Sequence, residues 1–353
     1  MDNNQIELSF LSIFTLITFF IFLIISKSSL IIRKDILLDK DFLKPQAFHK
    51  SAIGRVGGLG GIISLNIFFI IYYLIYSKIL FEYLFLCNLM FLIGFLDDLK
   101  IKISPSKRLA LMIIFLLALI HFLPIKILNI DIKFINIFLK NDIFSSFFVL
   151  LCFLFIINGA NLIDGFNGLL SVNLIIINSV LIYINLNNDN TEFSVFVIGQ
   201  MIILLSFLLF NFPKAKIFLG DSGAYLFGSL AALNAIITNN LNPKYSSFFF
   251  CTILFYLFFE VFFSFFRKIL QKKSPIHPDN KHLHMLTFKK ISSTFGKDKG
   301  NYINSLVINL AYLLLVSPAL IFAKNPMISR YWFFSLIIIY LLIYLRLYRL
   351  TKN

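Results

Sequence analysis

Residues 143–169 read IFSSFFVLLCFLFIINGANLIDGFNGL and join a membrane-type apolar run to a polar motif. The run Ile143–Ile157 consists of residues that cross bilayers as a helix. Asp164 follows closely, and a carboxylate at the mouth of a membrane span is costly to hold, so it usually serves a function. The motif adds three amide side chains as candidate ligand contacts: Asn158, Asn161 and Asn167.

The rest of the chain has the composition of a polytopic membrane protein. It is 59% hydrophobic and 14% charged, with a mean hydropathy of +0.88, which excludes an ordinary soluble domain. We expect an all-α fold in a single domain, residues 1–353, with about eleven transmembrane helices. The apolar runs lie at 7–27, 58–77, 79–96, 109–123, 143–158, 169–186, 194–212, 223–241, 246–266, 302–323 and 331–348.

The basic residues predict the orientation. With eleven spans, 25 of the 32 Lys and Arg residues fall on the side that holds the C-terminus, and cytoplasmic loops carry such an excess. The sequence therefore predicts an outside N-terminus and a cytosolic C-terminus. Basic residues spread over membrane loops favour anionic lipid headgroups, so nucleic acid is not an expected partner. The active site is expected in the cytosolic loops 28–57, 97–108, 158–168, 213–223 and 267–301.

Two motifs on this side combine flexible backbone, cations and carboxylates. Arg55 precedes Gly57 and Gly58, in a turn that either packs helices tightly or lets a guanidinium bind a phosphate. Asp97 and Asp98 end the third run, where they begin a solvated loop, retain one proton, or share a divalent cation. The cations that follow are candidates for binding an anionic headgroup: Lys100, Lys107 and Arg108.

A third acidic position and a histidine loop complete the set. Asp221 lies between glycines before a helix, either as an N-cap or as a metal ligand beside N–H groups that bind phosphate. Residues 274–285 read SPIHPDNKHLHM, and no cysteine lies nearby, so a zinc site is disfavoured. His282 and His284 fit better as donors to phosphate or as a proton relay.

All these motifs fall on the predicted cytosolic face. Carboxylates for Mg²⁺, cations for phosphate and glycines for close approach are the components of phosphoryl-transfer sites. The location predicts one lipid substrate and one cytosolic nucleotide substrate.

The motifs resemble those of the polyprenyl-phosphate N-acetylhexosamine-1-phosphate transferases of glycosyltransferase family 4. The resemblance covers Arg55 to Met285 with five motifs in order, and the Arg-Val-Gly-Gly turn and His-x-His loop resemble the branch that initiates O-antigen and enterobacterial common antigen. It implies transfer of a sugar-1-phosphate from a UDP-amino sugar to undecaprenyl phosphate. The products would be UMP and a lipid-linked sugar that starts cell-surface polysaccharide, such as lipopolysaccharide.

The resemblance also implies roles for individual residues. Asp221 would bind Mg²⁺, or Mn²⁺ in its place, while Asp97 and Asp98 would bind metal or receive a proton from the lipid phosphate. Asp164 would orient the nucleotide or the metal shell. The diphosphate would be steadied by Arg55, His282 and His284. The oligomeric state is left open between a monomer and a homodimer.

Two positions depart from the family pattern. Asn167 stands where the family often has Asp, in the segment associated with the nucleobase, and an amide carbonyl accepts the uracil N3–H without the charge. Met285 stands where a further His is frequent. These departures bear on which sugar nucleotide is used.

Two alternatives remain open, a related enzyme and a protein of a different class. A phospho-MurNAc-pentapeptide transferase is the nearest enzyme, disfavoured by Arg55 and the His-x-His loop. A membrane transporter would place ionisable residues near span centres. The acidic motifs lie at one surface instead, although Glu82 and Glu260, within or near spans, remain unexplained.

Overall fold

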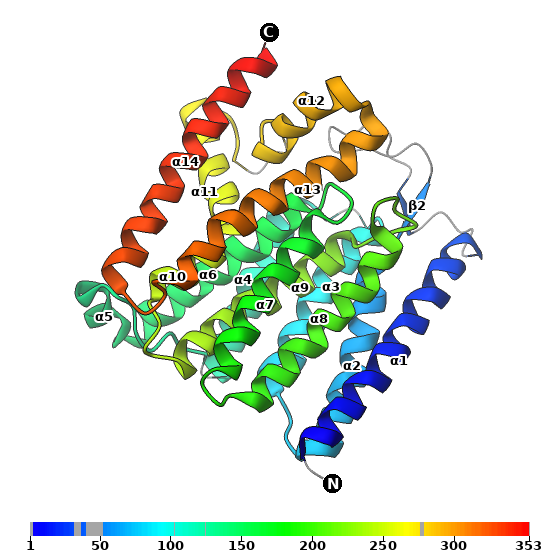
Figure 1. Cartoon of the computed structure of the whole chain (residues 1–353), viewed down its shortest axis with the longest axis vertical. Coiled ribbons are helices and arrows are strands. Elements are labelled where there is room, and N and C mark those ends of the chain that lie inside the picture. The colour runs from blue at the N-terminus through cyan, green and yellow to red at the C-terminus, as the bar shows by residue number, and fades with distance from the viewer. Residues whose placement is uncertain are drawn as a thin grey trace.

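The computed structural model describes residues 3–31, 37–39, 52–101, 103–123, 125–275 and 279–352. Most helices within these ranges lie side by side in a bundle (Figure 1). The first helices are α1 (Asn3–Ile31), α2 (Gly57–Tyr76), α3 (Phe81–Asp98), α4 (Pro105–Phe122), α5 (Lys133–Leu139), α6 (Asp142–Ile163) and α7 (Leu169–Leu186). The others are α8 (Thr191–Asn211), α9 (Gly220–Leu241), α10 (Ser247–Ile253), α11 (Phe255–Leu270), α12 (Leu283–Phe295), α13 (Lys297–Val316), a 3-10 turn η1 (Ser317–Leu320) and α14 (Pro326–Lys352).

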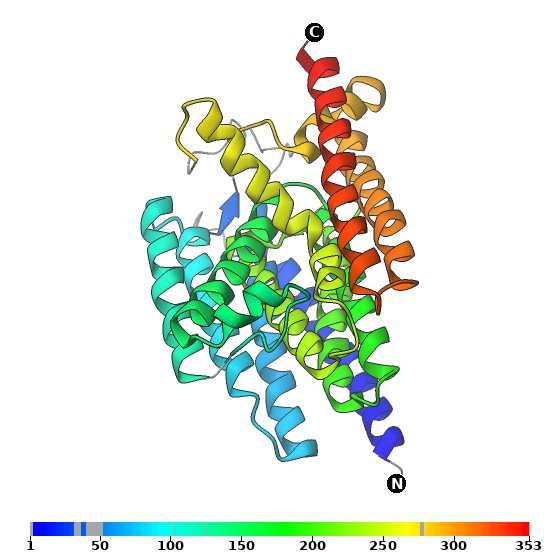
Figure 2. The same cartoon turned by 90° about the vertical axis from the view of Figure 1, so that its left-hand side faces the viewer.

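Each of the eleven predicted apolar runs falls on a helix of the described chain. The ninth is divided into α10 and α11, which are bent by 78°, and Figure 2 shows α11 rising toward the end that carries the strands. Eight described helices are long and apolar enough to cross a membrane, or nine if the bent pair forms one span. The prediction of an all-α multi-pass membrane protein is confirmed, whereas the count of eleven and the orientation remain predictions.

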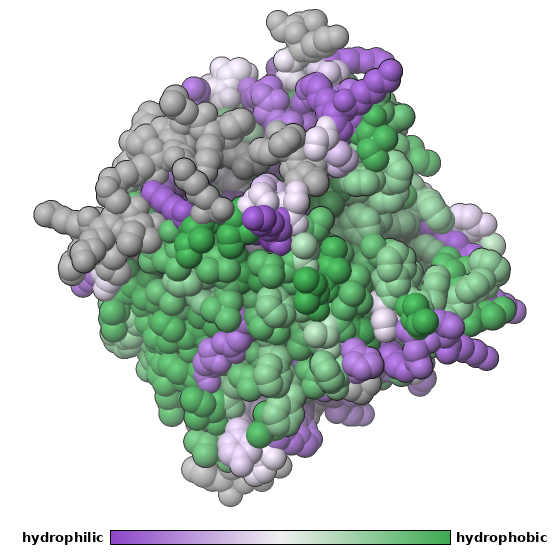
Figure 3. Space-filling model, turned by 180° about the vertical axis from the view of Figure 1, so that it is seen from behind, coloured by the Kyte–Doolittle hydropathy of each residue, from purple (hydrophilic) through white to green (hydrophobic). Residues whose placement is uncertain are grey.

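Hydrophilic residues gather at both ends of the bundle, with a hydrophobic belt between them (Figure 3). Helix α1 begins at one end and α14 finishes at the other, where α12 also lies (Figure 1). Seen from behind, a broad hydrophobic belt separates hydrophilic residues above it from a smaller group along the lower edge (Figure 3). The predicted cytosolic loop 28–57 lies partly outside the described residues, as do positions 276–278 of the histidine loop.

A small sheet joins the N-terminal region to the segment before α9, and the sequence did not predict it. Strand β1 (Leu38–Asp39) pairs antiparallel with β2 (Ile53–Arg55), and β2 pairs parallel with β3 (Ile217–Phe218). The register sets Arg55 opposite Phe218. The sheet therefore brings Arg55 to the segment that leads into Asp221.

Helices α3 and α9 form the most extensive helix pair, and amides bind them to α8. The hydroxyl of Tyr83 on α3 donates to Asn234 Oδ1 on α9 at 2.9 Å, and Asn234 Nδ2 donates to Gln200 Oε1 on α8 at 2.7 Å. All three side chains are buried. Such hydrogen bonds between helices stabilise a membrane bundle because lipid tails give helices no hydrophobic reason to associate.

Glycine allows the close approach of α6 to α11. A methyl group at Gly159 would overlap the backbone carbonyl of Leu257, an atom that moves only if the helix moves. At Gly165, in the same polar motif, no described atom lies within 4 Å of an added methyl group. The two glycines therefore serve different purposes.

We expect Gly159→Ala to destabilise the protein by ~1–3 kcal/mol, the usual cost of overpacking, because α6 and α11 must separate. The measurement is thermal unfolding of the purified protein in detergent. Gly165→Ala is the matched control and should unfold close to wild type. Equal unfolding temperatures for the two variants would contradict the packing role of Gly159.

Candidate active site

The carboxylate of Asp98, at the end of α3, caps the N-terminus of α9. Its Oδ1 accepts the backbone N–H of Asp221 at 3.1 Å, and its Oδ2 accepts that of Ser222 at 2.9 Å. The first N–H groups of a helix lack partners and carry partial positive charge, so a carboxylate is stabilised there. A methyl group at Gly220, where φ is +78°, would lie 2.7 Å from Asp98 Oδ2. Because Asp98 supplies the cap, the carboxylate of Asp221 is left for other contacts.

Arg108 bridges the other two carboxylates of the cluster. Its Nη1 lies 2.7 Å from Asp221 Oδ2 and 3.0 Å from Asp97 Oδ2. The side chain of Asp97 is 30% exposed and that of Asp221 is 20% exposed, whereas Asp98 is enclosed. Asp97 and Asp221 are therefore the carboxylates that a ligand can reach.

Arg55 reaches the cluster from the small sheet. It binds Asp39 Oδ2 through Nε at 3.1 Å and Nη2 at 2.7 Å, and its Nη1 lies 3.8 Å from Asp98 Oδ1. Asp39 was not predicted as a site residue, because a single Asp in a two-residue strand carries no recognisable pattern. The two arginines, Arg55 and Arg108, thus lie among four carboxylates, those of Asp39, Asp97, Asp98 and Asp221.

Crowding changes the acidity of these carboxyl groups. Burial, followed by the charge of Asp221, raises the pKa of Asp97 to about 6 and that of Asp98 to about 7. Burial, and then the charges of Asp221 and Asp98, raise the pKa of Asp164 well above its ordinary range. Asp164 therefore belongs to the same electrostatic cluster, which favours the uptake of a proton or a cation.

The turn after α6 is held by amides from other helices. The N–H of Gly168 donates to Asn211 Oδ1 at 2.7 Å, and that of Asn167 donates to Asn301 Oδ1 at 2.9 Å. The side-chain Nδ2 of Asn167 donates to the carbonyl of Pro213 at 2.9 Å. The amide nitrogen of Asn167 thus orders the turn, which leaves its Oδ1 as the acceptor for a nucleobase in the predicted role.

Gly57 and Gly58 are close to protein backbone. The N–H of Gly58 donates to the carbonyl of Leu219 at 2.8 Å, and a methyl group at Gly57 would lie 2.8 Å from the carbonyl oxygen of Phe218. Tight packing, one of the two roles left open by the sequence, explains both glycines.

Four further residues were predicted to contact the substrate: Asn158, Asn161, Lys100 and Lys107. Asn158 donates within its own helix to the carbonyl of Leu154 at 2.7 Å, and Asn161 lies half-buried nearly one turn further on. Lys100 and Lys107 are exposed. Their proposed binding of substrate stays a prediction.

The two histidines lie beneath the surface. His282 and His284 are 3% and 1% exposed, and both face the carboxylate of Glu260 on α11. The ring of His284 lies 5.9 Å from that of Phe166, which brings α12 against the turn containing Asp164. Glu260 was not predicted as a site residue, and its only signal was an acidic side chain inside an apolar run.

The oxygen donors of the acidic cluster fit a hard divalent cation such as Mg²⁺. The accessible carboxylates Asp97 and Asp221 share one cation, Arg108, and burial, followed by the charge of Asp221, raises the pKa of Asp97. Among the described residues, no group of three His, Cys, Asp or Glu side chains stands ready in a closed metal cage. A site completed by substrate oxygens and water agrees with both observations.

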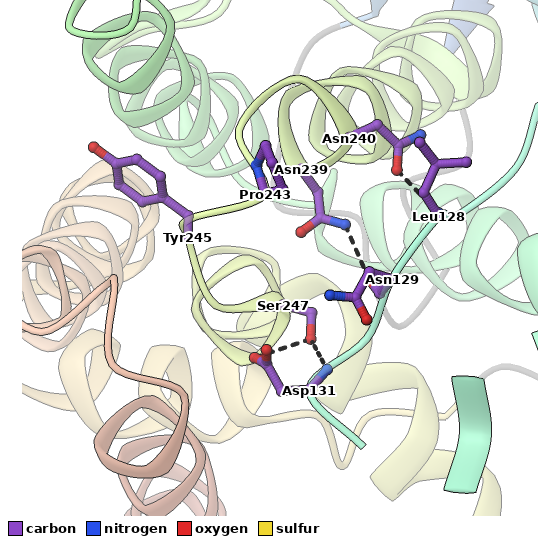
Figure 4. Close-up of a pocket in the computed structure, with 8 residues that line it drawn as sticks. All are labelled: Leu128, Asn129, Asp131, Asn239, Asn240, Pro243, Tyr245 and Ser247. Atoms are coloured by element: carbon purple, nitrogen blue, oxygen red, sulfur yellow. Dashed lines mark hydrogen bonds between the residues drawn. The ribbon is translucent and has the colours of Figure 1, made fainter. Parts of the chain in front are cut away.

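A separate cavity of about 170 Å³ lies among the loops near the end of α9 (Figure 4). Its wall includes hydrogen bonds such as the one from Asn239 Nδ2 to the carbonyl of Asn129 at 3.4 Å. None of the predicted site residues lines it, and the lining consists of Leu128, Asn129, Asp131, Asn239, Asn240, Pro243, Tyr245 and Ser247.

Comparison with known proteins places these features in one family. Residues 80–239 match the model for "Glycosyl transferase family 4". The chain is 30% identical over 253 residues to the undecaprenyl-phosphate alpha-N-acetylglucosaminyl 1-phosphate transferase of Thermotoga maritima, an alignment that covers 71% of each protein. This chain belongs to glycosyl transferase family 4. The predicted membership and the predicted class of enzyme are thereby confirmed.

Other members of the family align over a shorter stretch. The phospho-N-acetylmuramoyl-pentapeptide-transferase of Streptococcus agalactiae is 33% identical over 156 residues, which cover 41% of this chain and 45% of that protein. The Clostridium perfringens protein of the same name is 32% identical over 154 residues, covering 41% of this chain and 48% of its own length.

The raised pKa values predict a pH-dependent stability. Carboxyl groups that bind protons more tightly when folded lose stabilising free energy as the pH rises from about 4 toward the folded pKa values of about 6 and 7. We expect the unfolding temperature measured in EDTA to fall across this window. Asp221→Asn removes a charge that raises both pKa values, so its decline should be smaller. Equal pH slopes for the variant and wild type would contradict the coupling.

Asn167→Asp should not restore a better nucleotide site. The new carboxylate would place an oxygen against the carbonyl of Pro213 and remove its donor, which costs about 1 kcal/mol because this hydrogen bond is exposed to solvent. We expect a lower unfolding temperature and no tighter binding of UDP-sugar, measured by thermal unfolding with and without the nucleotide. Tighter binding at unchanged stability would show that Asn167 does not order the turn.

Proposed function

We propose that this protein transfers an N-acetylhexosamine-1-phosphate from its UDP-sugar to undecaprenyl phosphate at the cytosolic face of the bacterial cytoplasmic membrane. The cluster of carboxylates and arginines at the ends of α3, α4 and α9 carries the proposal, because it is suited to bind phosphate groups. The similarity to the Thermotoga maritima transferase over 71% of the chain supports this substrate class. The product would start a cell-surface polysaccharide.

The reaction exchanges one phosphoanhydride bond for another. An oxygen of the lipid phosphate forms a bond to the β-phosphorus of the UDP-sugar, while the bond from that phosphorus to the bridging oxygen breaks. UMP leaves with the bridging oxygen and its electron pair. The lipid phosphate is mostly ionised at neutral pH, with a second pKa of roughly 6, so placement and charge neutralisation matter more than a strong base.

The side chains of this site suit that task. Asp97, whose side chain is 30% exposed, would bind the metal or receive the remaining proton of a lipid monoanion. Arg108 and Arg55, now bound to carboxylates, have guanidinium groups with the geometry to hold phosphate oxygens. Asp98 keeps α9 in place rather than contacting substrate.

Asp97 and Asp221 would hold the Mg²⁺ expected for this chemistry, since their oxygens are the accessible ones. When bound, the ion would neutralise charge on the diphosphate. His284, whose ring packs against Phe166, and the amide Oδ1 of Asn167 would contact the sugar nucleotide.

A second candidate differs only in the donor. The pentapeptide transferases align with 41% of this chain and would require a UDP-linked muramoyl-pentapeptide. Membership of a glycosyl transferase family argues against the transporter alternative.

A single assay separates these functions. Purified protein is incubated with undecaprenyl phosphate, Mg²⁺ and a panel of radiolabelled UDP-sugars that includes UDP-MurNAc-pentapeptide, and released UMP is measured. We expect release with a UDP-N-acetylhexosamine and its loss in EDTA. Release with the pentapeptide donor alone would favour the second candidate, and no release with any donor would overturn both.

Asp221→Asn should abolish turnover while the protein stays folded. The substitution keeps the backbone N–H that Asp98 accepts but removes the accessible carboxylate beside Arg108. We expect UMP release to fall by on the order of 10³-fold, the size of effect seen when a major electrostatic group is lost. An unfolding temperature near that of wild type provides the control for folding, and full activity would remove Asp221 from the site.

A further inference from the structure

A buried carboxylate that the proposed reaction leaves unused holds the histidine loop in place. Glu260 on α11 is 1% exposed, and its Oε2 lies 3.3 Å from Nδ1 of His282. Its Oε1 accepts the backbone N–H of Leu283, the first residue of α12, at 3.1 Å. A buried charge is costly unless it is paired and hydrogen-bonded, so these contacts join α11 firmly to the start of α12.

His282 lies between two carboxylates. Its other ring nitrogen, Nε2, lies 3.3 Å from Asp279 Oδ1. Asp279 is fixed in turn by Arg267, whose Nη1 and Nη2 lie 2.8 Å and 3.2 Å from its two oxygens. A neutral imidazole has one donor and one acceptor nitrogen, and an acceptor nitrogen facing a carboxylate oxygen is repelled. A ring with protons on both nitrogens satisfies both carboxylates.

Two carboxylates face the ring of His282. Glu260 and Asp279 carry two negative charges there, and an imidazolium at His282 is attracted by both. The ring of His284 stacks on that of His282 with 5.4 Å between centroids and 2° between planes. Two positively charged rings would repel each other in this arrangement. Burial lowers the pKa of His284 to about 4, so this ring is neutral. The hydroxyl of Tyr256 lies 3.4 Å from its Nδ1.

We propose that Glu260 is a positioning residue that, with Asp279, holds His282 as a buried imidazolium and thereby presents the neutral His284 to the sugar nucleotide. The two histidines of the loop then have different roles. His282 orders the loop, and His284, packed against Phe166 and held through its carbonyl by Asn304 Nδ2 at 3.1 Å, contacts substrate. This last role rests on the proposed transferase function, whereas the protonation of His282 does not.

The test of protonation needs no substrate. The protein is labelled with ¹⁵N-histidine, and ring nitrogen shifts are recorded in detergent at about pH 8, where an unperturbed histidine of pKa ~6.5 is neutral. We expect one ring with both nitrogens protonated, absent from His282→Gln and from Glu260→Gln. Asp279→Asn is a second variant, at a partly exposed side chain, in case Glu260→Gln does not fold. A wild-type spectrum in which every ring is neutral would overturn the proposal.

The kinetic test addresses positioning. We expect Glu260→Gln to lower kcat for UMP release by about 10²-fold, the size expected when a catalytic contact is displaced by about an ångström, with a small change in KM. Glu192→Gln is the matched control, because Glu192 is likewise a glutamate with a donor on each carboxylate oxygen, but it lies outside the site. It accepts from the hydroxyl of Tyr72 at 2.7 Å and from Lys78 Nζ at 2.6 Å. It should keep wild-type kcat. Full kcat in folded Glu260→Gln would overturn the proposal, whereas a wild type that releases no UMP would overturn the transferase function and leave the spectrum to decide the role of Glu260.

Discussion

The site depends on one interaction, the acceptance of two α9 backbone N–H groups by the carboxylate of Asp98. This contact sets the end of α3 against the start of α9 and so fixes the separation of Asp97 from Asp221. Arg108 can bridge those two side chains only because their helices meet there. The two adjacent aspartates thus have different roles. Asp98 binds the backbone at the start of α9, and Asp97 remains accessible.

The helices that carry the acidic cluster are also unusual as membrane helices. Neither α3 nor α9 is among the eight described helices that are apolar enough to cross a membrane by composition, yet they form the most extensive pair in the bundle. Charged and amide side chains lower their hydropathy, and each helix shields the polar groups of the other from lipid. The two long helices of the described chain that fall short of this composition are therefore the pair that carries the acidic cluster of the candidate site.

Much of this arrangement could be predicted from sequence because it depends on local patterns. Apolar runs predicted the helices, and the occurrence of Asp97, Asp164 and Asp221 at run ends predicted their convergence. Contacts across long sequence separations escaped prediction. A cap was considered for Asp221 itself, but it comes from Asp98, 123 residues earlier in the chain. Asp39 lies in a strand of two residues, too short for any periodicity to show.

The buried amides among α3, α8 and α9 bear on the stability of α9 in lipid. Asn234 finds its partners, Tyr83 and Gln200, only when three helices meet. If α9 entered the lipid alone, these groups would face hydrocarbon without partners, at a cost that an isolated helix of this composition cannot offset. The polar face of α9 is therefore stable in lipid only beside α3 and α8, which makes the membrane stability of this helix dependent on its two neighbours.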